Sequence, residues 1–159
     1  MTPEVFAEHY RQHLPAIAKF LARRVDTSEV EDLCSDVFMK AYEKKHLAPA
    51  GYELAWLYSI AGHLVANHRR KQNTVGRLVT ALSIATYAPS AESLAVADLS
   101  LSQAWRKLKP AEQNLLALVA LDGTSVAEAA KILGISPNAA SVRLNRARTK
   151  LSGFMEVSE

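Results

Sequence analysis

Apolar residues recur every three or four positions along most of this chain, which is the spacing of helices that bury one face. The first such helix contains Pro15, which lacks a backbone N–H and should interrupt the helix near Leu14. No segment shows the clear two-residue alternation of a half-buried β-strand. The pattern predicts helices over residues 2–24, 28–44, 54–71, 94–108, 110–121, 125–133 and 136–151.

The helical spacing is lost over residues 73–93, where Ser, Thr and Ala dominate. Within this stretch, residues 75–82 could form a short helix, and residues 75–86 are an ambiguous candidate for a strand. We therefore expect an all-α protein of two small helical domains, at 1–72 and 94–159, joined by a linker at 73–93.

The last two predicted helices are joined by a glycine turn. Ser125 and Glu128 have the spacing of a capping box at the start of the first of them. Gly134 follows its last apolar residue and can adopt the left-handed conformation of a tight turn. Ser136 and Pro137 then suit the cap and the first position of the second helix. Two short helices joined in this way predict a helix-turn-helix in the C-terminal domain.

The second helix of this pair has two distinct faces. Ala140, Leu144, Ala147 and Leu151 fall on one narrow apolar stripe. The rest of its surface carries cations and short hydrogen-bonding side chains, which favours DNA binding over an ordinary solvated helix. The candidate DNA contacts are Asn138, Ser141, Val142, Arg143, Asn145, Arg146 and Lys150.

Charge is distributed unevenly along the 159 residues, whose net charge is +3. Residues 101–159 carry eight Lys and Arg against five Asp and Glu, as expected of a small DNA-binding module. Residues 1–72 are nearly balanced, with ten against nine, but the helix predicted over 28–44 has an acidic outer face that includes Asp32 and Asp36. This face is either a solvated surface or the complement of a basic protein surface.

The helix predicted over residues 54–71 ends in the run His68-Arg69-Arg70-Lys71. The helix dipole would explain one or two of these cations. Their proximity in sequence to Tyr52, Trp56 and Tyr58 favours single-stranded nucleic acid, because bases stack on aromatic rings while cations hold the phosphates. A place in the hydrophobic core is the alternative interpretation of Trp56.

Cys34 is the only cysteine, so no intramolecular disulfide can form, which fits a reducing compartment. The sequence shows neither a signal peptide nor an apolar run of membrane-spanning length. We expect a cytoplasmic protein without membrane insertion.

Three motifs, in this order, give the chain a resemblance to a known family. The first is EDLCSDVFMKAY at residues 31–42, which is similar to EDLVQEVFLRAY. The second is WLYSIA at 56–61 followed by His68-Arg69-Arg70, similar to WLYRIARNLAIDHLRR. The third runs from Leu108 to Leu151 and is similar to LPPEQREVLLL…GLSYEEIAEILGISVGTVKSRLSRARKKL. The chain resembles bacterial RNA polymerase sigma factors of the extracytoplasmic-function (ECF) group.

The resemblance implies a protein that binds core RNA polymerase, directs it to specific promoters and helps open the DNA. It implies no enzymatic activity, cofactor or metal. The domain at 1–72 would bind the polymerase β′ clamp helices through Asp32, Asp36, Val37, Phe38 and Lys40. It would bind the promoter minus-ten element through Tyr52, Trp56, His63, Asn67, Arg69, Arg70 and Lys71.

The resemblance also assigns roles to other parts of the chain. The loop at residues 46–53 would hold a base flipped from the non-template strand. The domain at 94–159 would bind the minus-thirty-five element and the β flap. An anti-sigma protein is a further partner that the resemblance implies.

The chain departs from the family pattern at positions that bear on base preference. His63 replaces the usual Asn, and Asn67 replaces the usual Asp. In the helix at 136–151, Arg143, Arg146 and Arg148 match the family, whereas Ala139, Ala140, Ser141 and Val142 differ from it. We expect phosphate anchoring to follow the family and base preference to be particular to this chain.

Two other functions fit parts of the sequence. A conventional helix-turn-helix regulator with an N-terminal partner domain usually dimerises, and the sequence shows no heptad seam. An enzyme could use His9, His13, His63 or His68 as metal ligands, but no clustered carboxylate or cysteine completes such a site.

Overall fold

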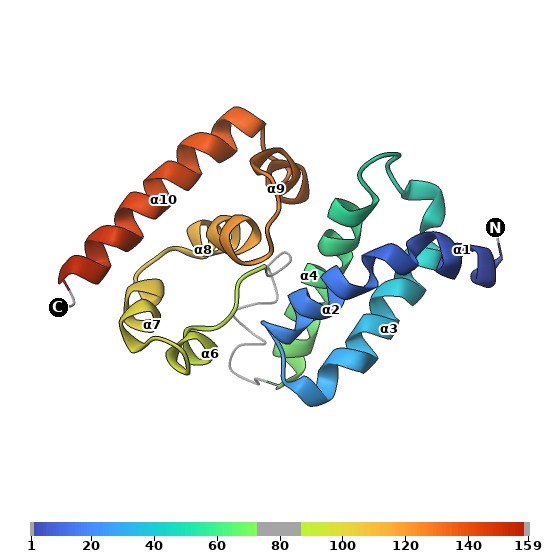
Figure 1. Ribbon diagram of the computed structural model, residues 1–159, viewed down its shortest axis with the longest axis horizontal. Coiled ribbons are helices and arrows are strands. Elements are labelled where there is room, and N and C mark those ends of the chain that lie inside the picture. Colours follow the sequence, from blue (N-terminus) through green and yellow to red (C-terminus); the bar gives the residue numbers. More distant parts are fainter. Residues whose placement is uncertain (1, 73–86, 158–159) are drawn as a thin grey trace. The chain divides into compact units, whose positions relative to one another are not determined.

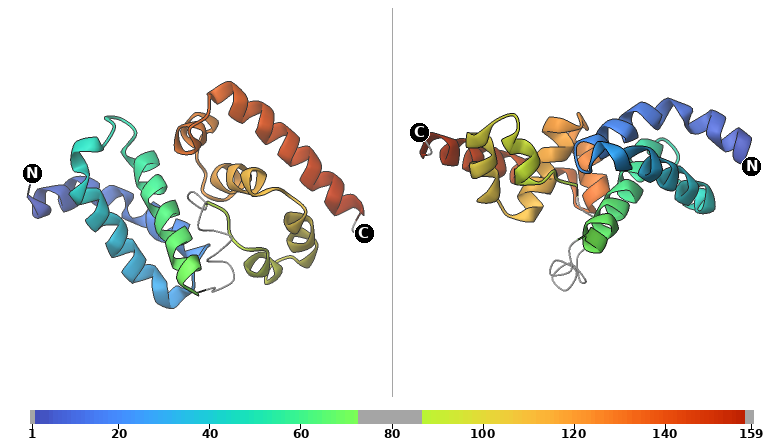
Figure 2. Two further views of the ribbon diagram at one scale, coloured as in Figure 1. Left: turned by 180° about the vertical axis from the view of Figure 1, so that it is seen from behind. Right: turned by 90° about the horizontal axis from the view of Figure 1, so that it is seen from below.

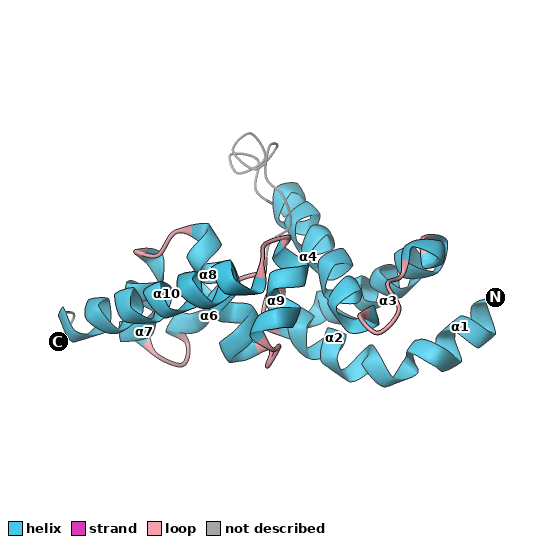
Figure 3. Cartoon of the chain, turned by 90° about the horizontal axis from the view of Figure 1, so that it is seen from above, coloured by secondary structure: helices cyan, strands magenta, loops and turns pink. Residues whose placement is uncertain are grey.

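The computed structural model describes residues 2–72 and 87–157, and within these residues the regular structure is entirely helical (Figures 1 and 3). The chain divides into two compact units, Met1–Thr86 and Tyr87–Glu159. The predicted all-α fold of two helical domains is confirmed. The short helix or strand considered for residues 75–86 lies outside the described residues.

The N-terminal unit contains α1 (Pro3–Tyr10), the 3₁₀ turn η1 (Arg11–His13), α2 (Leu14–Ala22), α3 (Thr27–Glu43), the 3₁₀ turn η2 (Lys45–Leu47) and α4 (Glu53–Gln72). Helices α2, α3 and α4 all pack against one another. Their shared core includes Ile17 and Phe20 of α2, Val37 of α3, and Leu57 and Val65 of α4, which are fully buried. The expected interruption near Leu14 is confirmed, because η1 separates α1 from α2, and Pro15 lies in the first turn of α2.

The C-terminal unit contains α6 (Ala91–Ala95), α7 (Leu99–Arg106), α8 (Pro110–Leu116), the π-helical turn η3 (Ala117–Leu121), α9 (Val126–Leu133) and α10 (Pro137–Val157). The long helix α10 packs against α7, α8 and α9, and Figure 2 shows it running straight from the turn after α9 towards the C-terminus. Ala140 and Ala147 of α10 are fully buried with Leu118 and Ala129. Small residues on α10 thereby allow close packing while its other faces stay exposed.

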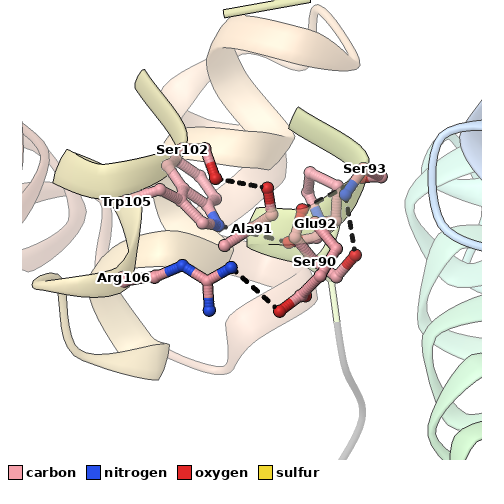
Figure 4. Close-up of polar contacts among 8 residues, drawn as sticks. Ser90, Ala91, Glu92, Ser93, Ser102, Trp105 and Arg106 are labelled. Carbon is pink, nitrogen blue, oxygen red and sulfur yellow. Dashed lines mark hydrogen bonds and ion pairs between the residues drawn. The ribbon is translucent and has the colours of Figure 1, made fainter. Parts of the chain in front are cut away.

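Side chains of α7 hold the segment that enters the C-terminal unit (Figure 4). Ser102 Oγ donates to the Ala91 carbonyl at 2.6 Å, and Trp105 Nε1 donates to the Pro89 carbonyl at 3.2 Å. Arg106 pairs with Glu92 at 3.0 Å. The packed unit therefore begins at Tyr87, earlier in the chain than the expected domain start at residue 94.

Two helix boundaries in this unit differ from the sequence prediction. The single helix expected over 94–108 is two helices, because Asp98 is extended and its carboxylate caps α7 by accepting the Leu101 N–H at 3.0 Å. Helix α10 continues to Val157, beyond the expected end at residue 151. Lys107 Nζ, directly after α7, lies 5.5 Å from the ring centre of Phe154, so this last part of α10 has a tertiary contact.

Candidate nucleic-acid and protein interfaces

The helix-turn-helix predicted at Ser125–Leu151 is present, with its caps in place. Ser125 Oγ accepts the Glu128 N–H, and Glu128 Oε1 accepts the Ser125 N–H, both at 3.0 Å. Gly134 ends α9 in the left-handed conformation, with φ of 70°. Ser136 Oγ then accepts the Ala139 N–H at 3.1 Å at the start of α10. These local bonds fix the turn that joins the two helices.

Helix α10 buries the expected stripe and exposes the expected contacts. Ala140, Leu144 and Ala147 are buried, and Leu151 is half-buried. The candidate DNA contacts on α10, all exposed, are Asn138, Ser141, Val142, Arg143, Asn145, Arg146 and Lys150. Val142 exposes 42% of its surface, which makes it an apolar position on an otherwise polar face. Such a side chain can contact a thymine methyl group in the major groove.

Lys150 forms an ion pair with another helix of its own unit, although its side chain is exposed. Its Nζ lies 2.8 Å from Glu112 Oε2, at the start of α8. Glu112 Oε1 also accepts the Lys109 N–H at 2.8 Å, so this carboxylate joins the cap of α8 to α10. The contact with Lys150, followed by the Lys109 N–H, lowers the pKa of Glu112. Lys150 is thus a tie between helices as well as a surface cation.

On α4, the outward face carries a row of candidate nucleic-acid contacts. Trp56, Ile60, His63, Asn67 and Arg70 follow one another at spacings of three or four residues, so they share one side of the helix. His63 and Asn67 are exposed, and the others are half-buried. Exposed Lys71 lies beside this row. The row combines an aromatic ring, hydrogen-bonding groups and cations.

Arg69 is half-buried on α4 and makes a hydrogen bond within the unit, and its expected DNA contact stays a prediction. Its Nη2 donates to the Arg24 carbonyl at 3.3 Å, linking α4 to the end of α2. Burial, and secondarily the nearby Arg24 charge, lower the pKa of Arg69. Arg24 itself donates to the Phe20 carbonyl at 2.8 Å and stacks 3.7 Å from the Phe20 ring centre. Arg69 therefore holds this corner of the unit together, because its guanidinium is directed inward.

The loop before α4 presents Tyr52 next to this face. Gly51 takes φ of 82°, and its N–H donates to Glu53 Oε1 at 3.3 Å. Backbone hydrogen bonds from Glu53 and Gly51 lower the pKa of Glu53. Tyr52 is 44% exposed, whereas Trp56 is half-buried with its ring centre 6.5 Å from that of Tyr10. The structure thus gives Trp56 both an exposed part and a packing role.

On α3, an acidic ridge lies beside an apolar groove. Asp32, Asp36 and Glu43 are exposed on one side of the helix, and Lys40 pairs with Glu43 at 3.8 Å. The groove has a volume of 530 Å³ and runs between α3 and the α1–η1 segment. Its apolar lining includes Phe6, Tyr10, Leu14, Phe38, Met39 and Tyr42.

The groove changes the list of candidate contacts on α3. Val37 is fully buried, so it packs inside the unit and is corrected from a polymerase contact to a core residue. Met39, which the sequence motif did not single out, is 63% exposed at the groove. The one signal in the sequence was that Met39 is a large apolar residue that lies off the buried stripe of the helix.

The histidines do not assemble into a metal centre. Among the described residues, no three His, Cys, Asp or Glu side chains are grouped so that they could hold a metal ion. His9 and His13 instead pack edge-on against Tyr10, at 5.0 and 6.0 Å between ring centres. Within residues 2–72 and 87–157, no helix combines the length and apolar character needed to cross a membrane.

Two family models match the chain in order. The model "Sigma-70 region 2" matches residues 9–75, which contain α2, α3 and α4. The model "Sigma-70, region 4" matches residues 98–151, which contain α7 to α9 and most of α10. The two matches fall one in each structural unit.

Named proteins are similar to the chain over nearly its whole length. The RNA polymerase sigma factor YlaC of Bacillus subtilis is 32% identical over 157 residues, covering 94% of this chain and 91% of YlaC. The ECF RNA polymerase sigma factor BldN of Streptomyces coelicolor is 28% identical over 160 residues. That match covers 96% of this chain but only 61% of BldN.

Solved structures share the fold. CnrH, in complex with the cytosolic domain of CnrY, matches with a TM-score of 0.65 and 24% identity, over 99% of this chain and 92% of that one. The sigma factor RpoE of Bartonella quintana, in complex with the anti-sigma factor NepR, matches with a TM-score of 0.63 and 22% identity, over 98% and 99%. At these identities the likeness concerns the fold.

Proposed function

The chain belongs to the RNA polymerase sigma factors, in their extracytoplasmic-function group, and we propose that it binds core RNA polymerase, directs it to specific promoters and helps open the DNA there. The observation that carries the proposal is the pairing of two surfaces in one chain. One unit holds a capped helix-turn-helix with exposed Arg143 and Arg146. The other holds the acidic ridge and groove on α3 and the row of polar and aromatic side chains on α4.

In the proposal, α10 contacts the upstream promoter element as duplex DNA. Arg143 and Arg146 bind phosphates, because their guanidinium groups are exposed. Asn138, Ser141, Val142 and Asn145 face the base edges, since they lie on the outer side of α10, away from its buried stripe. Lys150 plays a smaller part, because its Nζ is engaged by Glu112.

The α4 row contacts the downstream element after its strands separate. Tyr52 and the exposed part of Trp56 offer ring faces on which unpaired bases can stack. His63 and Asn67 supply hydrogen-bonding groups, while Arg70 and Lys71 bind phosphates. Binding unpaired bases in this way stabilises the open form of the promoter over the duplex.

The α3 surface docks on core polymerase. The groove offers an apolar seat, and Asp32 and Asp36 beside it offer negative charge. A helix of the polymerase with apolar and basic side chains would complement both features. In family terms this partner is the pair of β′ clamp helices, with Phe38 and Lys40 among the contacts, and the β flap is the partner of the C-terminal unit. An anti-sigma protein is a further partner in the proposal, as CnrH and RpoE are described in complexes with CnrY and NepR.

The proposal is tested with the purified chain and bacterial core RNA polymerase. We expect a complex that elutes together from a sizing column and that initiates transcription from a discrete subset of a genomic promoter library. Core polymerase alone is the control and should show no such selection. A chain that forms no complex with core polymerase, or that binds DNA as a dimer without it, overturns the proposal in favour of a conventional regulator.

A further inference from the structure

The hydrogen bond made by His63 fixes which of its ring nitrogens faces outward as an acceptor. His63 Nδ1 lies 2.8 Å from the Ser59 carbonyl oxygen, one helical turn earlier on α4. A carbonyl oxygen only accepts hydrogen bonds, so Nδ1 must carry the proton. The second nitrogen of the neutral ring, Nε2, therefore carries a lone pair. Because His63 is exposed, this acceptor is available to a ligand.

Asn67, one turn further along α4, has the opposite character. Arg70 Nη2 donates a hydrogen bond to Asn67 Oδ1. Since a guanidinium group can only donate, the amide oxygen of Asn67 must face Arg70. That orientation directs Nδ2, a donor, away from Arg70 within the amide plane. The exposed surface thus presents an acceptor from His63 beside a donor from Asn67, on residues whose Cβ atoms are about 5–6 Å apart at this spacing.

This order of groups matches one chemical class of base. On its Watson–Crick edge, each of adenine and cytosine carries an exocyclic amino donor next to a ring-nitrogen acceptor. On the same edge, guanine and thymine carry a carbonyl oxygen at the position of that amino group and a ring N–H next to it. That oxygen would face the Nε2 lone pair of His63, and the ring N–H would face the Asn67 amide donor. Neither contact is a hydrogen bond, so groups that give up water on binding would stay unpaired, which costs free energy. The pair can therefore reject guanine and thymine as well as accept adenine and cytosine.

We propose that His63 and Asn67 form an acceptor–donor pair that selects adenine or cytosine, read on the Watson–Crick edge, at one position of the unpaired promoter strand. The proposal rests on the proposed function, because it requires that α4 meets single-stranded promoter DNA. Arg70 is a positioning residue for the pair, because it orients the Asn67 amide. Trp56 and Tyr52, on the same side of the unit, supply stacking that does not depend on the base.

The test uses the complete chain bound to core polymerase and a DNA library that is unpaired and randomised across the downstream element. The bound fraction is sequenced. Wild type should enrich adenine and cytosine over guanine and thymine at one position by about fivefold, as expected of one net hydrogen bond. His63→Phe keeps an aromatic ring but removes the acceptor, so it should abolish enrichment at that position and leave the other positions unchanged.

Two further variants keep the test decisive. Asn67→Ala removes the donor and should weaken enrichment at the same position. Arg70→Met should weaken it too, because the Asn67 amide is then free to turn. Co-elution of each variant with core polymerase shows that it is folded.

The outcomes separate the two proposals. The acceptor–donor pair is overturned if His63→Phe leaves the base profile unchanged while the complex still binds the library. It is also overturned if Asn67→Ala and Arg70→Met both leave the profile unchanged under the same condition. In either case the sigma-factor function stands. The pair is likewise overturned if the enrichment that His63→Phe abolishes is for guanine or thymine. If wild type forms no complex with core polymerase, the proposed function fails, and this inference fails with it.

Discussion

Lys150 Nζ lies 2.8 Å from Glu112 Oε2, so the last cation of the predicted DNA-binding stripe is paired with a carboxylate of its own unit. Arg143 and Arg146, which precede it on the same helix, are exposed. The three cations look equivalent in the sequence, but only for Lys150 would binding a phosphate compete with this ion pair to Glu112. Because Lys150 has to break its contact with Glu112, its net contribution to the free energy of DNA binding is smaller.

This difference should appear in the salt dependence of promoter binding by the polymerase complex. Arg143→Ala and Arg146→Ala should each lower the slope of log affinity against log salt concentration by about one unit, if each side chain neutralises one phosphate. Lys150→Ala should lower the slope by clearly less than one unit. Fluorescence anisotropy on a promoter duplex over a salt series measures it. An equal loss of slope in Lys150→Ala and Arg146→Ala would show that the ion pair opens on binding.

The same carboxylate predicts a pH dependence of stability. The pKa of Glu112 is lowered in the folded protein by Lys150 and by the Lys109 N–H. A lowered pKa means that the stabilisation is present above the unfolded value, near 4.5, and is lost as pH falls through the folded value. The free energy of unfolding, measured with denaturant, should therefore fall more steeply between about pH 5 and pH 3 for wild type than for Glu112→Gln. The chain has two tryptophans, so a Trp56→Phe background leaves Trp105 as the reporter of the C-terminal unit.

Arg69 should behave as a structural residue, because it donates to the Arg24 carbonyl across the unit. Arg69→Ala should lower the free energy of unfolding of the N-terminal unit by about 1–3 kcal/mol, since it leaves a part-buried carbonyl without this donor. Lys71→Ala, an exposed neighbour, should change it by less than about 0.5 kcal/mol and weaken DNA binding instead. Trp56 fluorescence in a Trp105→Phe background reports the unfolding. Equal stabilities of the two variants would contradict this assignment.

What the sequence could predict depends on how far apart the interacting residues are. The caps at Ser125 and Ser136 and the left-handed Gly134 act over three or four residues, so residue type and spacing were sufficient. The break before α7 is also local, but Asp98 within an apolar pattern was too weak a signal. Lys150 and Arg69 were placed on the correct helices, and only their tertiary partners, 38 and 45 residues away, reveal their roles.

The groove on α3 was beyond the sequence for a similar reason. Its lining joins α3 to residues of α1 and η1, and no periodicity within one helix predicts which apolar residues remain exposed after packing. Val37 and Met39 are both apolar members of one motif, yet one is fully buried and the other is 63% exposed. The motif identified the helix, and the packing decides which side chains can meet a partner.

The entry of the chain into the C-terminal unit depends on a buried hydroxyl. Ser102 is almost completely buried and donates to the Ala91 carbonyl at 2.6 Å. Ser102→Ala should destabilise this unit by about 1–2 kcal/mol, because the carbonyl stays buried without its donor. Trp105 fluorescence in the Trp56→Phe background measures the change, and Ser152→Ala, an exposed serine on α10, is the matched control. A loss no larger than that of the control would mean that the segment is held by its other contacts alone.

The acidic ridge on α3 can be separated from the DNA-binding surfaces by charge reversal. Asp36 is exposed beside the groove and lies in the other unit from α10, so Asp36→Lys should alter the polymerase contact while α10 keeps its charge. Placing a cation against a basic partner surface should weaken binding to core polymerase by more than about tenfold. Glu156→Lys reverses an exposed charge at the far end of the chain and is the matched control, since it makes the same change in net charge. Competition with a labelled reference sigma factor for core polymerase measures both variants.

If the two variants lose affinity equally, net charge explains the effect and the ridge has no specific role. If only Asp36→Lys loses affinity, and the loss shrinks as salt is raised, the contact is electrostatic and local to α3.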